Sequence, residues 1–493
     1  MPARPRSFYS RLFPDQYGGY PKKSVSGLSD WMEDTKEHRG DRPRAIPGLI
    51  PSGYAYFAQF VSHDLSYDKT KLSEAADLPP EATPNYRTPS LDLEILYGRG
   101  LRNDGYLTLG STDGSGTTAS SDNDLDREGS GQANVYDPRN DSTLLLAQLH
   151  VLLIKFHNRL LEDVRRGKLA SVSDGDDIEQ TKRLVRWHYQ WIVRNDLLPK
   201  IVMADVLEDI TMHWPRLFRP KRGHASIPVE FSLAAFQYGH SAVNFIYNIN
   251  RNVINCPQEA TMYLTGPGHF QWPVGTGRPF NRLPERFVVD PGRMFGWASR
   301  AKVNFSAIIG TLITEGLYEV PGQQSMLFNN EPLEASNLTI SKRSGSDTFS
   351  LPEATLVRGA AVGLPSGQQA SRLAGIDTLG KDQLACDARL ETFLRKNEML
   401  DRTPLFYYLL REAEVAGRSA PGKAPGTRLG PLGSRIVAEV ILGVLNADAN
   451  SYVHTDWQPP ELPVSIADVK IRIDSLKKLM FYATGYKSQL DRE

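Results

Sequence analysis

Residues 141–160 read DSTLLLAQLHVLLIKFHNRL and predict a long buried helix. Asp141 or Ser142 is the expected N-terminal cap, because short polar side chains accept the first free backbone N–H groups. We expect two histidines of this helix, His150 and His157, to bond neighbouring helices in structural roles. Hydrophobic side chains recur every three or four positions, which places them on one helix face: Leu145, Leu149, Leu152, Phe156 and Leu160.

Three further stretches have helical periodicity, and strand-like alternation is sparse. They span residues 177–198, 231–245 and 434–445, and Pro199 is expected to end the first of them. The sequence therefore predicts a mainly α fold, a single large domain with few short strands.

Composition supports a globular protein without a polyanionic partner. The chain has 493 residues, of which 40% are hydrophobic and 9% aromatic, enough for a sizeable core. The 57 Lys+Arg balance the 57 Asp+Glu, so charge gives no reason to expect nucleic acid or an anionic membrane surface as a partner. Two cysteines, Cys256 and Cys386, cannot form a disulfide framework; a single bridge is the alternative, and the favoured interpretation is two reduced core thiols.

Changes in composition divide the chain. Residues 1–50 are rich in Pro, Gly and charge and are expected to form an extended arm packed on the body. Residues 51–493 form the main domain. Within it, residues 110–132 read GSTDGSGTTASSDNDLDREGSGQ, with one Leu and no aromatic residue, and predict a mobile surface loop.

The N-terminal residues are positively charged but have no hydrophobic stretch, so they do not form a signal peptide. We expect no membrane span, because the apolar stretch VAEVILGVL near the C-terminus falls far short of the roughly 18 residues required. The default location is the cytoplasm, and secretion without a leader would leave no mark in the sequence.

Histidines are the best candidates for chemistry. Motifs for zinc hydrolysis, iron–sulfur clusters, nucleotide binding and serine hydrolysis are absent. Among ten histidines, His63 lies in QFVSHD and His240 in FQYGHS. A lone histidine is most simply a hydrogen-bonded structural side chain.

The segment YFAQFVSHDL, residues 56–65, resembles the distal-histidine segment of the animal-type haem peroxidases, the superfamily of myeloperoxidase and cyclooxygenase. The closest likeness is to bacterial members of that family. Six further segments resemble the family in the family's order: residues 87–98, 137–160, 193–202, 236–241, 356–368 and 433–445.

The resemblance implies a haem site with catalytic residues on both faces. His240 would be the proximal iron ligand, His63 the distal acid and base, and Arg139 the fixed positive charge that a breaking O–O bond requires. Gln59 lies four residues before His63, on the same side of a helix, and can hold a distal water or anion.

Departures from the family concern how haem is held. Many mammalian members form ester bonds to haem from an Asp and a Glu, but this chain has Ser62 and Ser142 at those positions, so haem b should bind non-covalently. Thr355 replaces the family's usual Asn beside the proximal His, which alters the tuning of that ligand. Arg358 matches the family and is expected to pair with a haem propionate.

The resemblance also implies one calcium ion. Asp64 would be one ligand, and the family's loop would supply the others: Thr88, Ser90 through its carbonyl, Asp92 and Glu94. Carboxylate and hydroxyl oxygens are the hard ligands that calcium prefers.

We therefore expect a haem peroxidase that reduces hydrogen peroxide, oxidises small organic, halide or pseudohalide donors, and acts in the response to oxidative stress. One alternative is a fatty-acid dioxygenase on the same fold, but the radical-forming Tyr of that branch would stand where this chain has Gln237, one residue before Tyr238. Another is a non-catalytic interaction protein that kept only the fold. His63 and Arg139 favour the peroxidase.

Overall fold

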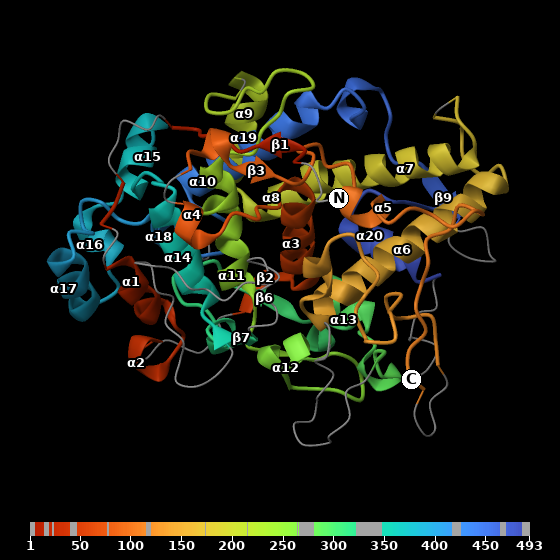
Figure 1. Ribbon diagram of the computed structural model, residues 1–493, viewed down its shortest axis with the longest axis horizontal. Helices are drawn as coiled ribbons and strands as arrows, with labels where there is room; N and C mark the ends of the chain where they lie inside the picture. Colours follow the sequence, from red (N-terminus) through yellow and green to blue (C-terminus); the bar gives the residue numbers. More distant parts are fainter. Residues whose placement is uncertain are drawn as a thin grey trace.

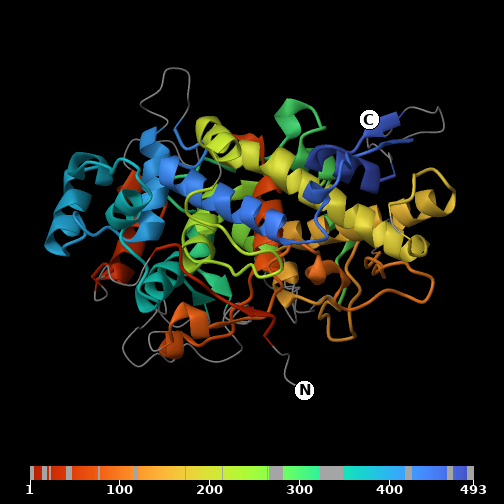
Figure 2. The ribbon, with the colours of Figure 1, turned by 90° about the horizontal axis from the view of Figure 1, so that it is seen from above.

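The computed structural model describes residues 5–13, 19–21, 24–39, 47–75, 78–114, 120–172, 174–213, 215–263, 265, 281–321, 348–416, 425–463 and 470–485. Helices dominate these residues (Figure 1), which confirms a mainly α fold with few short strands in one large domain. In the views of Figures 1 and 2, helix α3 (Gly53–Leu65) lies in the middle of the molecule.

The other α-helices are α1 (Val25–Met32), α2 (Lys36–Arg39), α4 (Leu72–Ala75), α5 (Glu94–Tyr97), α6 (Leu144–Arg165), α7 (Asp177–Ile192), α8 (Leu198–Ile201), α9 (Ala204–His213), α10 (Val229–Ser232), α11 (Gly239–Ala242), α12 (Gln258–Tyr263), α13 (Pro291–Phe295), α14 (Leu351–Ala361), α15 (Gly367–Leu373), α16 (Lys381–Leu384), α17 (Ala388–Lys396), α18 (Leu405–Ala416), α19 (Pro431–Ala447) and α20 (Leu476–Ala483). The 3₁₀ helices are η1 (Pro80–Ala82), η2 (Pro138–Asp141), η4 (Ala235–Tyr238), η5 (Glu285–Phe287), η6 (Arg300–Lys302), η7 (Glu315–Leu317) and η9 (Tyr452–His454), and η3 (Val193–Leu197) is a short π-helix.

The described strands form only two-stranded antiparallel pairs. These are β1 (Ser7–Phe8) with β3 (Pro84–Asn85), β2 (Pro47–Pro51) with β6 (Phe305–Ala307), β4 (Ile246–Tyr247) with β5 (Cys256–Pro257), β7 (Val320–Pro321) with β8 (Thr348–Phe349), and β9 (Glu461–Pro463) with β10 (Lys470–Arg472).

Helix α6 is the long core helix that its periodicity predicts, and it packs against α3, α7 and α20. Its cap is Thr143, whose hydroxyl accepts from the Leu146 N–H at 3.3 Å, so the expected cap at Asp141 or Ser142 was wrong by one or two positions. Asp141 instead ends η2. The helix is long and apolar enough to cross a membrane, but 83% of its apolar window is buried, as in the core helix of a globular protein.

The two histidines of α6 are structural, as expected, but only one has bonds to other segments. His157 contacts the Tyr97 hydroxyl on α5 and the Gly105 carbonyl, both at 3.0 Å. His150 packs edge-on against Phe60 of α3. Its Nδ1 is buried without a hydrogen-bond partner among the described residues.

Helix α7 begins where the sequence predicts, but Pro199 does not end it. The π-helix η3 follows directly, and α8 then continues the chain to Ile201. Pro199 lies in the first turn of α8, where a missing backbone N–H breaks no helical hydrogen bond.

The single helix expected over residues 231–245 is wrong, because the chain forms three short pieces, α10, η4 and α11. Ala234, before η4, leaves the helical region at φ −136° and ψ −69°. The side chain of Gln237 donates to the Ser232 carbonyl at 2.6 Å and so satisfies an acceptor that a continuous helix would have bonded through its backbone. This break determines how His240 is presented.

The described part of residues 1–50 is more regular than an extended arm. β1 pairs with β3, but α1 is a helix that packs against α14. Tyr9, Phe13 and Tyr20 are buried. The segment packs on the body, while a domain boundary at residue 50 stays a prediction.

The predicted mobile loop, residues 110–132, is partly core. Residues 115–119 lie outside the described part. Asp124 and Leu125 are buried, and the Arg127 guanidinium pairs with Asp124 at 2.9 Å and with Asp141 at 2.7 Å. The polar composition did not predict this burial, because the buried charges of Asp124, Arg127 and Asp141 are paired with one another.

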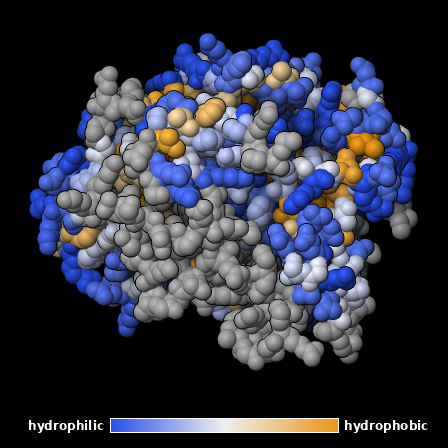
Figure 3. All heavy atoms as spheres, viewed as in Figure 1, coloured by the Kyte–Doolittle hydropathy of each residue, from blue (hydrophilic) through white to orange (hydrophobic). Residues whose placement is uncertain are grey.

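Neither cysteine forms a disulfide among the described residues, but only Cys256 is buried, so the prediction of two core thiols was wrong for the exposed Cys386. On the face in Figure 3, hydrophobic residues form small separate groups among hydrophilic ones. The large exposed hydrophobic side chains come from separate segments: Phe8, Leu49, Leu78, Met212 and Ile254.

Candidate haem site

A cavity of about 210 Å³ brings together all six residues predicted for catalysis and haem binding. Helix α3 supplies Gln59 and His63, η2 supplies Arg139, α11 supplies His240, and α14 supplies Thr355 and Arg358. Figure 1 shows α3 and α11 running alongside each other, and the two helices are in contact.

Helix α3 positions Gln59 and His63 one turn apart, so both line the cavity. The next residue, Asp64, is fully buried and bonds the backbone N–H of Leu93 at 3.1 Å instead. One helix therefore serves the cavity with one residue and the predicted calcium loop with the next.

His63 is held by a residue that the sequence did not single out. Its Nδ1 lies 2.8 Å from Oδ1 of Asn140, so that nitrogen carries the proton and the other ring nitrogen is left as an acceptor. Burial, and then the positive charge of Arg139, lower the pKa of His63 to about 3. The imidazole is therefore neutral at ordinary pH and able to take up a proton.

Several hydrogen bonds hold the Arg139 guanidinium in one position at the cavity wall. Its Nε and Nη2 bond Asp137, and Nη2 also donates to the carbonyls of His63 at 3.2 Å and Ser66 at 2.8 Å. The guanidinium lies over the Tyr67 ring at 4.3 Å. Nη1 makes no hydrogen bond to the described protein, so this corner of the guanidinium remains for a ligand.

Asp137 joins two arginines to the end of helix α3. It is fully buried, caps η2 by accepting from the Arg139 N–H, and bonds Arg87, whose Nε donates to the His63 carbonyl at 3.2 Å. The two guanidinium groups hold the pKa of Asp137 well below its usual range, although burial alone would raise it. An Asp two residues before Arg139 is a helix-cap signal in the sequence, and it could have identified Asp137.

His240 is presented differently from His63. Its Nδ1 is buried and has no hydrogen-bond partner among the described residues, and burial lowers its pKa to about 4. Thr355, at the position of the family's Asn, does not bond it, because the Thr355 hydroxyl donates to the Leu351 carbonyl of its own helix at 2.9 Å.

Arg358 lines the cavity with both terminal amino groups occupied. Nη2 pairs with Asp68, and Nη1 donates to the Thr70 carbonyl at 3.1 Å. A propionate at this edge would therefore meet an Arg–Asp pair. Asp68 is a third residue, after Asn140 and Asp137, that the sequence analysis did not identify.

The two positions that carry haem esters in mammalian relatives, Ser62 and Ser142, both line the cavity. The neighbouring carboxylate of Asp141 cannot replace them, because both of its oxygens bond Arg127. Gln237 also lines the cavity. The buried Tyr238 hydroxyl does not, and it has no partner among the described residues.

The predicted calcium residues meet only in part. Asp64 Oδ1 is buried and has no donor among the described residues, and burial together with the charge of Asp92 raises the pKa of Asp64 to about 8. Glu94 is engaged through one oxygen only: Oε1 pairs with Arg6 and accepts from Tyr136, both at 3.1 Å, and Oε2 is buried without a partner among the described residues. The backbone N–H of Ser90 bonds the Thr88 carbonyl at 2.9 Å, so these two residues form one turn.

The chemistry of the cavity fits a haem. The neutral imidazole of His240 on one wall, whose Nδ1 is buried without a partner among the described residues, is suited to ligate iron, and a neutral base beside a guanidinium lines the same space. Clusters of three or more His, Cys, Asp or Glu side chains able to hold a metal ion are absent from the described residues. A calcium site would therefore depend on Asp64, Asp92 and neutral oxygens.

Fold and cavity together match what is expected of a haem-peroxidase domain. The family model for animal haem peroxidases matches residues 30–265, which include His63, Arg139 and His240 but not Thr355 or Arg358. Residues 30–265, just under half of the chain, thus match an animal haem peroxidase domain.

A curated relative, heme peroxidase 2 of Caenorhabditis elegans, is 29% identical over 159 residues, which are 29% of this chain and 21% of that protein. The match thus spans about a fifth of the relative's length. These comparisons do not test the expected likeness to bacterial members, which stays a prediction.

Two solved structures show the same fold at low identity. Peroxidase A from Dictyostelium discoideum has a TM-score of 0.56 and 14% identity, covering 91% of this chain and 89% of its own. The fatty acid alpha-dioxygenase of Arabidopsis thaliana has a TM-score of 0.55 and 13% identity, covering 99% and 77%. The fold is thus shared by proteins named for two different activities.

Proposed function

We propose that this protein is a haem peroxidase that reduces hydrogen peroxide and oxidises small donors. The observation that carries the proposal is the cavity that His63 and Arg139 share with His240. Haem b would be held by His240 without covalent attachment, because the ester positions carry Ser62 and Ser142. Arg358, with its Asp68 partner, would face a propionate.

When bound, the haem would supply an iron centre that binds peroxide and takes up its oxidising equivalents. The chain supplies the proton transfers. The free ring nitrogen of His63 accepts a proton from peroxide and returns it to the oxygen that leaves as water. Asn140 holds the imidazole in the tautomer that this requires.

Charge stabilisation falls to Arg139. Nη1 is the donor that can face the leaving oxygen, while Asp137 and the carbonyls at the end of α3 fix the rest of the guanidinium. A preorganised donor of this kind stabilises the charge that develops as a bond breaks. Gln59, one turn from His63, would hold a water or an anion in the same space.

The expected donor range follows from the absence of ester-forming residues, because Ser62 and Ser142 stand at the two positions that carry them in mammalian relatives. In the family, ester bonds raise the oxidising power of the haem, so iodide, thiocyanate and phenols are the expected donors, and chloride should react poorly. The dioxygenase alternative is disfavoured by Gln237, because the cavity wall has an amide where that branch would have its radical-forming Tyr.

Calcium is proposed as a second cofactor, bound between Asp64 and Asp92. Burial and the charge of Asp92 raise the pKa of Asp64, so a cation between these carboxylates would stabilise their ionised forms. Ser90 and Thr88 would complete the oxygen ligands. Glu94, expected from the resemblance, bonds Arg6 and Tyr136 through Oε1, so only its Oε2 would be left for the ion.

The test is an absorption spectrum of the purified protein during a peroxide titration, compared with His240→Ala. We expect a haem spectrum that changes with peroxide in the wild type and loss of most haem in the variant. The exposed His213 on α9 provides the control, since His213→Ala should retain haem.

Full haem retention in His240→Ala would move the iron ligand elsewhere. Acid–acetone extraction tests non-covalent attachment, because haem that stays with the protein would show a covalent bond. A steady-state halide series tests the donor range, and efficient chloride oxidation at neutral pH would contradict it.

A further inference from the structure

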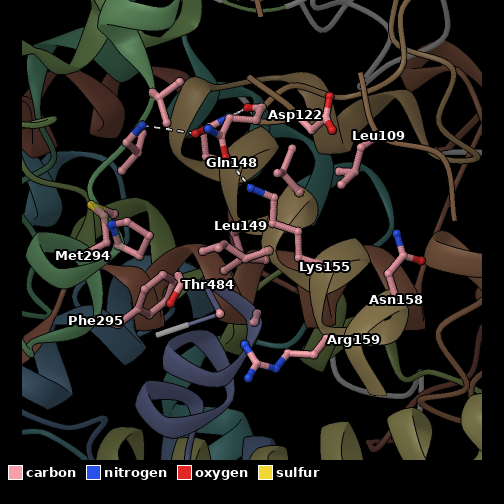
Figure 4. Close-up of a pocket in the computed structure, with 18 of the residues that line it drawn as sticks. Leu109, Asp122, Gln148, Leu149, Lys155, Asn158, Arg159, Met294, Phe295 and Thr484 are labelled. Atoms are coloured by element: carbon pink, nitrogen blue, oxygen red, sulfur yellow. Dashed lines mark hydrogen bonds between the residues drawn. The ribbon is translucent and has the colours of Figure 1, made fainter. Parts of the chain in front are cut away.

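A second cavity, of about 630 Å³, lies beside the haem cavity and has no role in the function proposed above. Helices α6 and α13 and the end of α20 line most of it (Figure 4). Tyr56 lines both cavities, so one side chain stands between them. The volume of this second cavity falls within the range of small-molecule sites.

Part of the lining is apolar and aromatic. Leu149 and Leu152 of α6 contribute aliphatic side chains, and Met294 and Phe295 of α13 contribute a thioether and a ring; all four are buried. Trp297 also lines the cavity, and its indole stacks on Phe295 with ring centres 6.1 Å apart and planes at 17°. In the view of Figure 4, Met294 and Phe295 lie on the same side of the cavity. Rings and a polarisable thioether favour contact with an aromatic ligand.

Two basic side chains of α6 in the lining are engaged with the protein. The Lys155 ammonium donates to the amide oxygen of Asn123, and the Arg159 guanidinium lies 4.6 Å from the centre of the Tyr482 ring. Figure 4 shows Leu149 between the charged ends of these two side chains. One anionic group therefore cannot meet both of them, and neither is a ready counter-ion for a ligand.

The acidic side chains of α6 are paired with basic ones. Glu162 pairs with Arg166 at 3.5 Å, and both of these side chains are exposed. Asp163 pairs with Lys168 at 2.7 Å and accepts from the Tyr482 hydroxyl. These charges satisfy one another and do not call for a charged ligand.

The other acids of the lining have partners as well. Asp290 caps α13 by accepting from the Gly292 N–H and pairs with Arg293 at 3.4 Å. Asp122 accepts from the Ser111 hydroxyl at 3.0 Å. A ligand cation would therefore compete with bonds that the protein already makes.

The amide side chains of the lining are bonded through both oxygen and nitrogen. Gln148 accepts from the Val289 N–H at 3.1 Å and donates to the Asn123 carbonyl at 2.6 Å. Asn158 accepts from the N–H of Leu107 at 2.8 Å and donates to the carbonyl of the same residue at 2.9 Å. These amides serve the fold and hold the wall in place.

Trp297 differs from these polar groups, because its donor is not used by the protein. The residue is half-buried, and its indole N–H makes no hydrogen bond within the part of the chain that the structure describes. An indole N–H donates only, so a ligand group that bonds it must be an acceptor. The lining thus combines an apolar and aromatic surface, charges that already have partners, and an indole donor.

We propose that this second cavity binds an uncharged aromatic carbonyl compound, the class to which quinones belong. The ring would pack against Leu149, Met294 and Phe295, and the carbonyl oxygen would accept from the indole N–H of Trp297. Burial of the ring would supply affinity, and the hydrogen bond would fix the orientation. A charged ligand is disfavoured, because a charge removed from water without a partner is costly. This inference depends on neither haem nor peroxidase activity.

The test is equilibrium dialysis of the purified full-length chain against three naphthalenes that differ in one substituent at the same ring position. Acetylnaphthalene carries a carbonyl, ethylnaphthalene has no acceptor, and naphthoate carries a negative charge. Naphthoate should bind at least about tenfold more weakly than acetylnaphthalene, because its charge finds no unpaired counter-ion in the lining.

Variants assign the carbonyl to Trp297. Trp297→Phe keeps a ring and removes the N–H, so acetylnaphthalene should bind about threefold to tenfold more weakly and ethylnaphthalene should be unaffected. Phe295→Leu removes an aromatic contact and should weaken both ligands about threefold or more. The matched control is Trp31→Phe on α1, outside the cavity, where Trp31 packs against Phe393; it should change neither affinity.

Four results would each overturn the proposal. These are no binding of acetylnaphthalene, equal affinity for naphthoate, unchanged acetylnaphthalene affinity in folded Trp297→Phe, and an equal loss of both ligands in that variant, which would assign the indole to packing alone. Thermal melting followed by circular dichroism establishes that the variants are folded. If Trp297→Phe does not fold, unchanged affinities in folded Phe295→Leu would overturn the proposal instead.

Discussion

The two walls of the haem cavity differ in how their histidines are supported. On the distal wall, formed by α3 and η2, Asn140 holds His63, and Asp137 and the end of α3 hold Arg139. On the proximal wall, formed by α10, η4, α11 and α14, His240 Nδ1 is buried without a partner among the described residues. The polar atoms of Ser232 and Gln258, which line the same cavity, are in the same condition.

The protein itself positions the catalytic groups of the distal wall, whereas a bound haem would complete the proximal wall. A buried polar atom without a partner costs about 1–3 kcal/mol, so a wall with several gains from any group that covers or ligates them. On the distal wall, protein atoms hold the groups assigned to proton transfer and charge stabilisation, His63 and Arg139, although Nδ2 of Asn140 is buried without a partner among the described residues. Changes on the distal wall should therefore alter rates, and the proximal wall should control haem binding.

The largest effect should come from His63→Ala. The reaction with peroxide should slow about 10²–10⁴-fold, because the variant lacks the base that moves the proton. Haem content should stay unchanged, since the proximal wall is untouched. Stopped-flow mixing with peroxide measures the rate, and wild-type speed in a haem-loaded variant would break the division of roles.

Asp137→Asn should destabilise the fold by about 3–5 kcal/mol, because it leaves two buried guanidinium groups without their shared carboxylate. The pKa of Asp137 is depressed in the folded state, so its contribution is present above the ordinary Asp pKa of about 3.9 and is lost at lower pH.

Urea unfolding at neutral pH measures this loss. The control Asp104→Asn removes an exposed pair with Arg102, 2.8 Å long, and should change stability by less than about 1 kcal/mol. Equal effects of the two substitutions would show that the buried cluster of Asp137, Arg87 and Arg139 stabilises the fold no more than a surface ion pair does.

Glu230→Gln tests the proximal side, where Glu230 of α10 accepts from the backbone N–H groups of Leu12 at 3.0 Å and Phe13 at 3.4 Å. Burial raises the pKa of Glu230 to about 7. Its protonation therefore stabilises the fold fully below about pH 4.5, and this contribution disappears as pH rises through 7.

Between pH 4.5 and 7.5 the wild type should lose about 3 kcal/mol relative to Glu230→Gln, which cannot ionise. Urea unfolding across that pH range measures the difference. Parallel curves for the two proteins would contradict the shifted ionisation of Glu230.

Removing calcium should lower the unfolding free energy by about 2.7 kcal/mol relative to protein at a calcium concentration 100 times Kd. Asp64→Asn and Asp92→Asn should abolish this difference. Glu94→Gln should reduce it less, because Oε1 of Glu94 is engaged with Arg6 and Tyr136 and only Oε2 is left for the ion. Differential scanning calorimetry with and without a chelator measures the shift, and identical melting in both conditions would remove calcium from the distal side.

Asn140→Ala should have the smallest effect, about a tenfold slower reaction with peroxide. His63 would lose a hydrogen bond of about 1–1.5 kcal/mol that fixes its tautomer, but it would remain in the cavity. The same stopped-flow experiment measures this, with haem content as the control. A loss as large as that of His63→Ala would mean that Asn140 itself acts on peroxide.

Local pattern was enough to predict the core helix α6 and the shared side of Gln59 and His63, because both depend on helical spacing. The gathering of His63, Arg139 and His240 around one cavity came from the resemblance, since spacing alone cannot bring residue 240 to residue 63. Asn140 escaped notice because its partner lies 77 positions away. The broken helix before His240 was missed because a side chain, Gln237, replaces a backbone bond.

The N-terminal segment has a consequence for how the protein is made. Tyr9 lines the haem cavity, and its neighbours bond residues far along the chain: Ser10 bonds Ile227, and Arg11 bonds Val362 and Gly363. During synthesis these early residues must wait until residue 363 has left the ribosome before their site exists. The cavity wall is thus completed by residues made long before their partners, and loop closure over some 350 positions is a slow kind of folding event.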